Sequence, residues 1–438
     1  MKYTVKDILR MEVAPALGCT EPVAIALGAA AAASLLPDRE IDSVEIWVDP
    51  NIYKNGIAVS IPGTGGLSGL DTAAAIGALG GDAKMKLEVL ESVDDALTAR
   101  TLKFLKADKV KVNLLSDQKG LYIKTVLHSG ADKAESLIRD MHDNITELSL
   151  NGVPVKGSTL LSEAKPGGKS DLAEMEACLK KLSLEKLLDL VDDLDDDDLA
   201  FLEEGIRHNM RLADFGIKHG SGLGVGKALE RLARQKLIKR DMILTARILS
   251  SAAADARMSG VKLPAMSSAG SGNHGLTAIL PIVAVNEFME IDKKIMLGAV
   301  GLSHIITAYV KSFTGRLSAV CGCSIAAGAG AAAGIVYLLG GDIRHIAGAI
   351  KNLTEDLAGV ICDGAKAGCA LKLSTAAGTA VQAALFSLHG VRVEPTDGII
   401  GISPEQTIQN IGTLSTVGMI ETDRTILKIM LEKRFSGF

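Results

Sequence analysis

Aromatic side chains are scarce in this sequence. They make up 3% of the 438 residues and include a single tryptophan, Trp47. Hydrophobic residues nevertheless supply 47% of the chain, and 46 residues are glycine. The distance between packed helices depends on the side chains at their contact, so a core rich in small residues brings backbones close together. The length predicts two or three domains.

The chain also lacks an excess of positive charge. Its formal net charge is −5, whereas a general nucleic-acid surface needs a basic stripe that neutralises phosphates. We therefore expect no nucleic-acid partner. The apolar run at residues 24–36 follows Asp7, Glu12 and Glu21, which does not fit the basic start of an export signal. We expect the protein to be cytoplasmic.

One uncharged stretch, residues 317–341, is long enough to span a bilayer. It consists mainly of alanine and glycine, which gain little from lipid, and it includes two cysteines. The pattern favours a buried helix in a soluble core, and we expect no membrane partner.

The fold class that these patterns predict is α+β, a mostly α-helical catalytic domain with an inserted α/β domain. Residues 1–40 are predicted to be helices that pack on the catalytic domain, 41–165 the α/β domain, and 166–438 the helical domain. Within the insert the patterns predict strands at 43–49, 56–62 and 147–150, a hairpin of 109–115 with 121–128, and a helix at 133–143. Residues 158–171 read as a linker.

Further helices are predicted along the carboxy-terminal half. The acidic run 195–198 is typical of a solvated helix start, because carboxylates favour the positive end of the helix dipole. Helical patterns cover 182–194, 240–258, 295–309, 318–339, 345–360 and 375–388. Alanine-rich faces of this kind also favour a homodimer.

Cysteine is too rare for a disulfide scaffold, with six in the whole chain. Cys178 lies in a plain amphipathic pattern and is given no role. The other five lie in three short segments, around Cys19, at Cys321 with Cys323, and at Cys362 with Cys369. Each cysteine alone is more often an ordinary small core residue than a ligand. Cys321-Gly-Cys323 is too short for a zinc knuckle, and runs of the ferredoxin type are absent. The remaining thiolates, from separate segments, suit a cluster with three protein ligands and one open iron.

Several motifs resemble the L-cysteine desulfidase family over essentially the whole chain. They are Cys19-Thr-Glu-Pro, Asn55-Gly with Pro62-Gly-Thr-Gly, Ser268-Ala-Gly-Ser-Gly-Asn-His-Gly, Cys321-Gly-Cys-Ser-Ile-Ala-Ala-Gly and Cys362-Asp-Gly-Ala-Lys. Residues 220–388 are also similar to the alpha chain of iron–sulfur L-serine dehydratase, through the glycine-rich segment 271–281 and Cys362-Asp363.

The resemblance implies a [4Fe–4S] cluster held by three cysteines. Cys321 and Cys362 carry the ligand role most firmly. The third ligand is Cys19 if the desulfidase pattern applies, or Cys369 if the dehydratase pattern applies, and Cys323 ranks behind Cys321. Some dehydratases carry a cysteine at the carboxy end that reaches the cluster, whereas this chain ends Lys433-Arg-Phe-Ser-Gly-Phe, so inhibition by a tail thiolate is not expected.

The expected reaction removes a β-substituent from a small amino-acid substrate. His274 and His219 lie in glycine-rich segments and are the candidates for acid–base catalysis, although a satisfied structural histidine is an equal alternative for each. Lys366 is a candidate for binding the substrate carboxylate, and a solvated lysine is its alternative. Substrate binding is further predicted at the loop residues Ser271, Gly272, Asn273 and Thr64.

Three other readings stay open. L-Serine dehydratase would share the mechanism and differ in the leaving group. A non-catalytic protein that senses or stores iron and sulfur would explain the cysteines but not the glycine, histidine and lysine segments beside them. A pyridoxal-phosphate lyase would need a phosphate cup next to a Schiff-base lysine, and none is recognisable beside Lys366. The glycines at 220–226 do not follow a strand, so a dinucleotide fingerprint is rejected.

Overall fold

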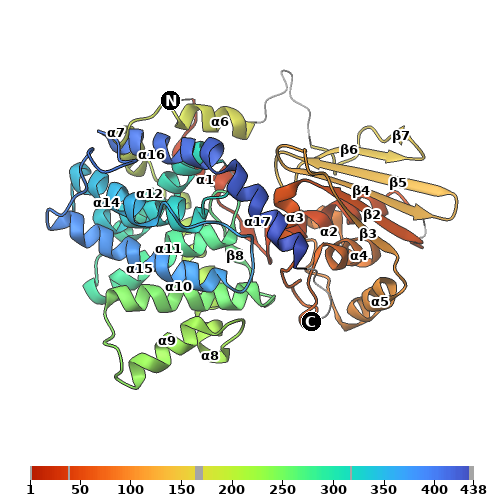
Figure 1. The fold of residues 1–438 in the computed structure, drawn as a ribbon, viewed down its shortest axis with the longest axis horizontal. Helices are drawn as coiled ribbons and strands as arrows, with labels where there is room; N and C mark the ends of the chain where they lie inside the picture. The colour runs from red at the N-terminus through yellow and green to blue at the C-terminus, as the bar shows by residue number, and fades with distance from the viewer. Residues whose placement is uncertain (1, 38–39, 163–170, 316–317, 434–438) are drawn as a thin grey trace.

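The computed structural model describes residues 2–37, 40–162, 171–315 and 318–433. A larger helical part and a smaller part built on a sheet lie side by side (Figure 1). Each has its own hydrophobic core, one centred on the helices that follow residue 170 and the other between the sheet and its covering helices. The expected α+β class is confirmed. The linker predicted at 158–171 lies largely outside the described residues.

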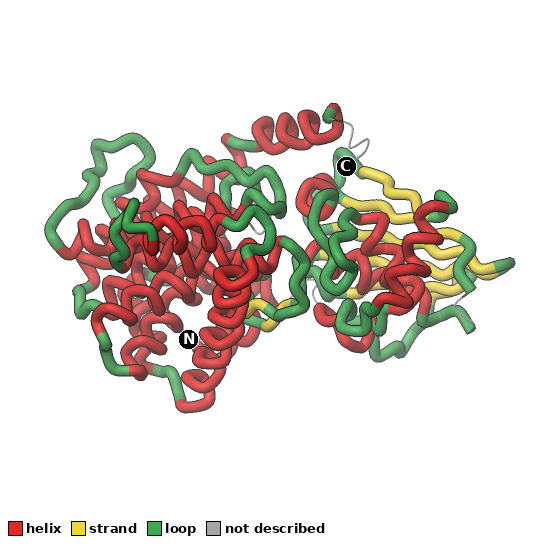
Figure 2. The backbone as a smooth tube through the Cα atoms, turned by 90° about the horizontal axis from the view of Figure 1, so that it is seen from below, coloured by secondary structure: helices red, strands yellow, loops and turns green. Residues whose placement is uncertain are grey.

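The smaller part is a six-stranded sheet in the order β3-β2-β4-β5-β6-β7. Strands β2 and β3 are parallel, and the other neighbours are antiparallel. In β2 every second side chain, starting at Val44, is buried, as expected for a strand with one covered face. Figure 2 shows helices over one face of this sheet. The strands are β2 (Ser43–Val48), β3 (Val110–Leu114), β4 (Tyr122–Ser129), β5 (Asp132–Arg139), β6 (Ile145–Leu150) and β7 (Val153–Pro154), and the helices after α2 are α3 (Pro50–Gly56), α4 (Leu70–Gly80), the 3-10 helix η1 (Ala83–Glu88) and α5 (Asp95–Lys106).

The first helices divide between the two parts. Helix α1 (Val5–Glu12) packs against the helical part, whereas α2 (Thr20–Ala33) is buried along its whole length between α4 and the sheet. A Cβ at Gly77 of α4 would lie 2.1 Å from the Ala26 carbonyl oxygen, so glycine permits this close helix pair. The expected packing of residues 1–40 on the helical domain therefore describes α1 and not α2. An all-apolar helix can pack in either core, and its pattern does not say which.

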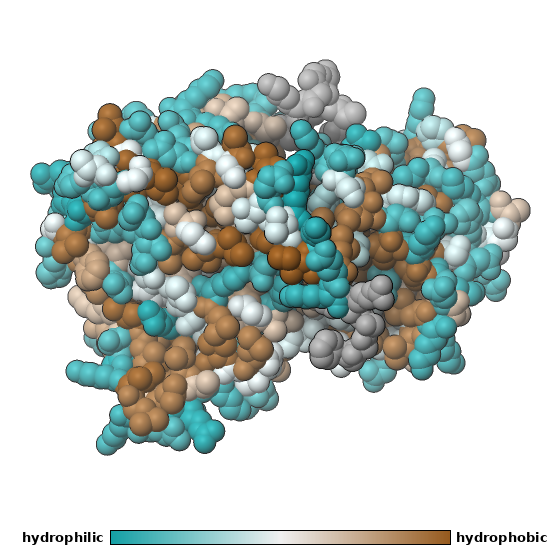
Figure 3. Space-filling view, in the orientation of Figure 1, coloured by the Kyte–Doolittle hydropathy of each residue, from teal (hydrophilic) through white to brown (hydrophobic). Residues whose placement is uncertain are grey.

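The larger part is almost entirely helical. Helices α10, α11 and α15 pack against one another at its centre, and the short strands β1 (Pro15–Ala16) and β8 (Ala265–Met266) pair beside them. On the face shown in Figure 3, hydrophilic side chains cover both parts with apolar patches between them. The remaining elements are α6 (Asp171–Leu179), α7 (Leu184–Asp192), α8 (Asp196–His219), α9 (Val225–Arg234), α10 (Met242–Met258), α11 (Gly272–Met289), α12 (Lys293–Thr314), the π-helix η2 (Cys323–Ala327), α13 (Gly328–Leu338), α14 (Ile343–Leu357), α15 (Cys369–Leu388), α16 (Pro404–Thr413), the π-helix η3 (Leu414–Gly418) and α17 (Ile420–Glu432).

Most of the predicted helices are confirmed within a few residues, including 182–194, 240–258 and 295–309. The acidic run is a helix start, as predicted. Asp195 is the N-cap of α8, and its side chain and that of Asp198 form a reciprocal capping box with each other's backbone.

Three predictions within the insert were wrong. Residues 109–115 and 121–128 do form strands, but β2 lies between them, so they are not a hairpin. Residues 133–143 form strand β5 instead of a helix, because pairing with β4 and β6 outweighs a pattern that also fits a helix. Residues 56–62 form no strand beyond an isolated bridge between Ser60 and Ser68, because the glycines that follow turn the chain back at once.

Two helices are long and apolar enough to cross a membrane, α12 and α15. The apolar window of α12 is 89% buried inside the protein and that of α15 is 56% buried, as in core helices. This is weak support for a membrane span. Of the uncharged stretch 317–341, the described residues form η2 and α13, which are buried.

Candidate active site

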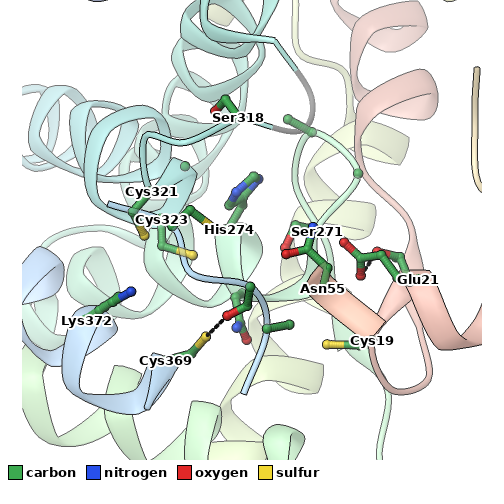
Figure 4. Close-up of a pocket in the computed structure, with 18 of the residues that line it drawn as sticks. Cys19, Glu21, Asn55, Ser271, His274, Ser318, Cys321, Cys323, Cys369 and Lys372 are labelled. Atoms are coloured by element: carbon green, nitrogen blue, oxygen red, sulfur yellow. Dashed lines mark hydrogen bonds between the residues drawn. The ribbon is translucent and has the colours of Figure 1, made fainter. Parts of the chain in front are cut away.

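A cavity of about 90 Å³ lies between the two parts. One water needs roughly 10–15 Å³ by this measure, so several would fit. The smaller part contributes Cys19, Thr20 and Glu21 at the start of α2, Asn55 of α3, and His142 from the β5–β6 loop. The helical part contributes the other lining residues, among them Arg257, Ser271, Asn273, His274, Lys311, Cys321, Cys323, Cys362, Cys369 and Lys372 (Figure 4).

Two cysteine segments are joined by backbone pairing. Cys321 N–H donates to the Val360 carbonyl oxygen at 2.9 Å, and Cys362 N–H donates to that of Ala319 at 2.6 Å. Cys323 begins the π-helix η2, and π-turns are frequent at functional sites. Cys369 begins α15. Segments that are about 40 residues apart in sequence therefore present four thiols to one cavity, and Figure 4 shows those of Cys321, Cys323 and Cys369.

The four thiols are not equivalent. A hydrogen bond from Cys323 lowers the pKa of Cys321, against the effect of burial. The same bond and burial raise the pKa of Cys323 well above its usual value. Burial raises the pKa of Cys362, and that of Cys369 to about 12. Since the thiolate is the form that binds metals, Cys321 is the position most ready to act as a ligand.

Cys19 joins the cavity from the start of α2, in the smaller part of the protein. Its thiol is buried, and burial raises its pKa to about 11, while Arg257 opposes that shift. Cys19 packs with Val59 and Met258 in a small apolar cluster that Cys369 also touches. Both candidates for a third thiolate ligand, Cys19 and Cys369, therefore lie at the same end of the cavity.

This donor set suits a cluster better than a single ion. Within the described ranges, no three His, Cys, Asp or Glu side chains converge closely enough to hold one metal ion. A cluster with several irons needs a wider spacing, because each thiolate binds a different iron atom, and its protein ligands are thiolates. Cysteine thiols that face one cavity fit that requirement.

One ring nitrogen of His274 forms a hydrogen bond, and the other faces the segment that contains Cys321 and Cys323. It lies in the first turn of α11 and not in a loop as expected. Nδ1 lies 3.2 Å from the Ser268 carbonyl oxygen, which can only accept, so Nδ1 carries the proton. Nε2 faces Gly322, where a Cβ would lie 2.3 Å away. Burial, aided by Lys311, lowers the pKa of His274 to about 3, so the neutral ring offers Nε2 as an acceptor.

Not all predicted site residues line the cavity. Ser271 and Asn273 do, but Gly272 instead packs against the Arg257 side chain. His219 is exposed at the end of α8, with its ring 4.3 Å from that of Phe215. The Thr64 hydroxyl donates to the Ile61 carbonyl oxygen at 2.7 Å within a turn.

Lys366 lies next to the cavity but is not among its lining residues. Its Nζ is buried without a hydrogen-bond partner among the described residues, and burial lowers its pKa. Lys372, which the sequence did not single out, does line the cavity. It pairs with Asp363 and donates to the Ile361 carbonyl oxygen at 2.9 Å, which ties the Cys362 segment to α15.

The structure adds further polar residues that the sequence analysis did not assign to the site, among them Glu21, Asn55, Arg257 and His142. Glu21 follows Cys19 by two positions in the Cys-Thr-Glu-Pro motif, so that motif could have identified it. Asn55 lies in the quoted Asn-Gly pair. Arg257 lies on a plain helix, and His142 lies in a loop without a recognisable motif. Nothing in the sequence alone marks these last two.

Comparison with known proteins defines the family. The model of the serine dehydratase alpha chain family matches residues 84–428. The chain is 66% identical to a UPF0597 protein of Desulfatibacillum aliphaticivorans over 437 residues, covering 100% of both chains. It is 63% identical to a UPF0597 protein of Desulfotalea psychrophila, again over 100% of both, and 43% identical to one of Clostridioides difficile over 97% of this chain and 98% of that one. The chain belongs to the serine dehydratase alpha chain family and to its relatives named UPF0597.

Proposed function

We propose that this protein is an iron–sulfur-dependent lyase that converts L-cysteine and water to pyruvate, ammonia and sulfide. The observation that carries the proposal is the set of buried thiols that line one cavity together with acidic, basic and amide side chains. Membership of a dehydratase-type family supports the same reaction class, a β-elimination. The free state of all six cysteines supports a reducing cytoplasmic setting.

Cys321 and Cys362 would hold the [4Fe–4S] cluster, with Cys19 or Cys369 as the third ligand. When bound, a cluster with three protein ligands supplies an open, Lewis-acidic iron. Lys54 donates to the Cys362 carbonyl oxygen at 3.2 Å and Lys372 ties the same segment to α15, so this chain fixes the Cys362 loop from both sides.

The protein groups at the cavity handle the proton and the substrate. His274 presents an unprotonated Nε2 toward the cysteine segment, where it can accept a proton or orient the β-substituent. His142 faces the same cavity from the other part of the protein. Elimination breaks the Cα–H and Cβ–S bonds and leaves an aminoacrylate, which water converts to pyruvate and ammonia.

The second candidate is L-serine dehydratase, which the family match favours. The same residues would act on serine, with water as the leaving group. Thiolate ligands and a thiophilic iron favour sulfide departure but do not forbid departure of water.

The experiment is to purify the protein without oxygen, supply iron and sulfide, and measure pyruvate and sulfide from L-cysteine and L-serine in parallel. We expect pyruvate with equal sulfide from cysteine, and loss of both with loss of cluster absorbance in Cys362→Ala. Cys178→Ala, on α6 outside the cavity, is the matched control and should retain cluster and turnover. Turnover of serine alone would assign the dehydratase, and a bound cluster without turnover of either would support a sensing or storage role.

A further inference from the structure

Glu21 is a buried carboxylate without a cation. It lies in the first turn of α2, is 8% exposed and lines the cavity. Its Oε2 accepts a hydrogen bond from the Thr20 hydroxyl at 3.1 Å. No Lys, Arg or His of the described residues lies within ion-pair distance of it. Burying a charge costs free energy unless the charge is paired, so a positively charged ligand group next to this carboxylate would be stabilising.

Arg257 carries the opposite charge in the same cavity. It lies on α10, is 3% exposed and lines the same cavity. Nη1 donates to Asn273 Oδ1 at 2.9 Å and Nη2 donates to the Gly18 carbonyl oxygen at 2.7 Å. Both acceptors are neutral, and in the described part of the chain no carboxylate pairs with this guanidinium. These two bonds fix the planar fork and leave its charge uncompensated.

The two charges flank the same thiol without meeting each other. Glu21 follows Cys19 by two positions at the start of α2, and Arg257 donates to the carbonyl oxygen of Gly18, the residue before Cys19, so both lie near Cys19. They form no ion pair with one another, although an Arg and a Glu in contact would neutralise both. Neutral hydrogen-bonding groups of Asn55, Ser271 and Asn273 also line the cavity, and Figure 4 shows Asn55 and Ser271 near Glu21. A separated anion and cation in one small cavity match a ligand that carries both charges on groups attached to one carbon.

We propose that Glu21 and Arg257 recognise the two charged groups of a free α-amino acid. Glu21 binds the ammonium group and Arg257 binds the carboxylate. A ligand held at both ends directs its β-substituent toward the wall formed by Cys321, Cys323 and Cys362. This inference rests on the proposed function for the identity of the site, and it adds the two residues that bind the charged groups of the substrate. Hydroxy acids and N-acylated amino acids lack the ammonium group and should be rejected.

The test uses ligands that cannot react. L-Alanine has both charged groups but no leaving group, and propionate lacks the ammonium group. Their dissociation constants are measured by calorimetry on anaerobic, cluster-loaded protein. A hydrogen bond to a charged group is worth about 1.5–3 kcal/mol, so L-alanine should bind roughly ten- to a hundredfold more tightly than propionate.

Glu21→Gln removes the charge and keeps the size of the side chain. We expect it to lose the preference for L-alanine while binding propionate as the native protein does. Glu405→Gln is the matched control, because Glu405 accepts a bond from the Leu184 N–H in the helical part, outside the cavity lining. It should keep the preference. Arg257→Lys should weaken both ligands, since lysine cannot reproduce the fork.

Equal binding of L-alanine and propionate by the native protein would overturn the proposal without any variant. So would a Glu21→Gln protein that still prefers L-alanine. Failure of the proposed lyase reaction is a separate result, seen as absence of pyruvate from protein that does bind L-alanine through Glu21.

Discussion

Gly322 is the position where one added methyl group tests the geometry of the site most directly. It lies between Cys321 and Cys323 with a φ of −62°, a helical conformation that alanine also adopts. A Cβ there would lie 2.3 Å from His274 Nε2 and 2.8 Å from Cε1. Gly322→Ala therefore creates no backbone strain, and its whole effect comes from displacing the His274 ring.

The expected loss of stability can be worked out from the space and the hydrogen bond that the His274 ring would lose. His274 is 7% exposed, so it has little room to move. Overpacking a dense core costs about 1–3 kcal/mol. Loss of the bond from Nδ1 to Ser268 adds about 0.5–1.5 kcal/mol. Alanine is about 0.5–1 kcal/mol more favourable than glycine in a helical conformation, and this gain offsets part of the loss. We expect a net loss of about 0.5–4 kcal/mol in the free energy of unfolding, together with loss of lyase turnover.

Two optical signals separate the parts of the protein during urea unfolding. Helix ellipticity reports mainly on the helical part, whereas fluorescence of the only tryptophan, Trp47, reports on strand β2 of the smaller part. The ellipticity midpoint of Gly322→Ala should fall. Gly359→Ala is the control, because a Cβ at that glycine meets no atom within 4 Å. It should shift stability by less than about 0.5 kcal/mol.

A Gly322→Ala protein with native stability and native turnover would refute this reasoning. It would mean that the His274 ring moves freely and that its contact with Gly322 has no part in the site. Equal losses in Gly322→Ala and Gly359→Ala would also refute it, because the clash would then not be the cause.

Three further outcomes are expected. Burial lowers the pKa of His304 to about 4 from 6.5, so protonation favours unfolding, and stability should fall by up to about 3 kcal/mol as the pH drops from 6.5 to 4. His304→Gln should show a smaller drop in urea midpoint between pH 7 and pH 4.5, and an equal drop would contradict this. Lys54→Met should cost about 1–3 kcal/mol in urea unfolding, because buried Lys54 pairs with Asp423 of α17, and an unchanged midpoint would count against that pairing. Cys178→Ser should bind as much iron as the native protein by metal analysis, whereas Cys321→Ser should bind less, and equal iron in both would remove Cys321 from the ligand set.

The sequence predicted the fold class because its local patterns agree with the final packing. Alternation at residues 43–49 predicted strand β2, and the acidic run 195–198 predicted the start of α8. Patterns failed where pairing between distant segments decided the outcome. Residues 133–143 fit a helix by themselves, but they form β5 because β4 and β6 lie on either side.

The cysteine motifs and the glycine-rich motif identified part of the candidate site. Cys19, Cys321, Cys362 and Cys369 all line the cavity, as do Ser271, Asn273 and His274. His219 and Thr64 do not, because a histidine or threonine beside glycines looks the same whether it faces a ligand or closes a turn.

Only the tertiary structure brought Arg257 and His142 to this cavity, and only the structure left Glu21 and Arg257 buried without partners of opposite charge. The sequence alone determined which residues could bind metal or move protons, because that chemistry belongs to each side chain. It could not determine which of them meet, since the packing of α2 against the sheet and of α10 against α11 and α15 sets their positions across more than 200 residues of chain.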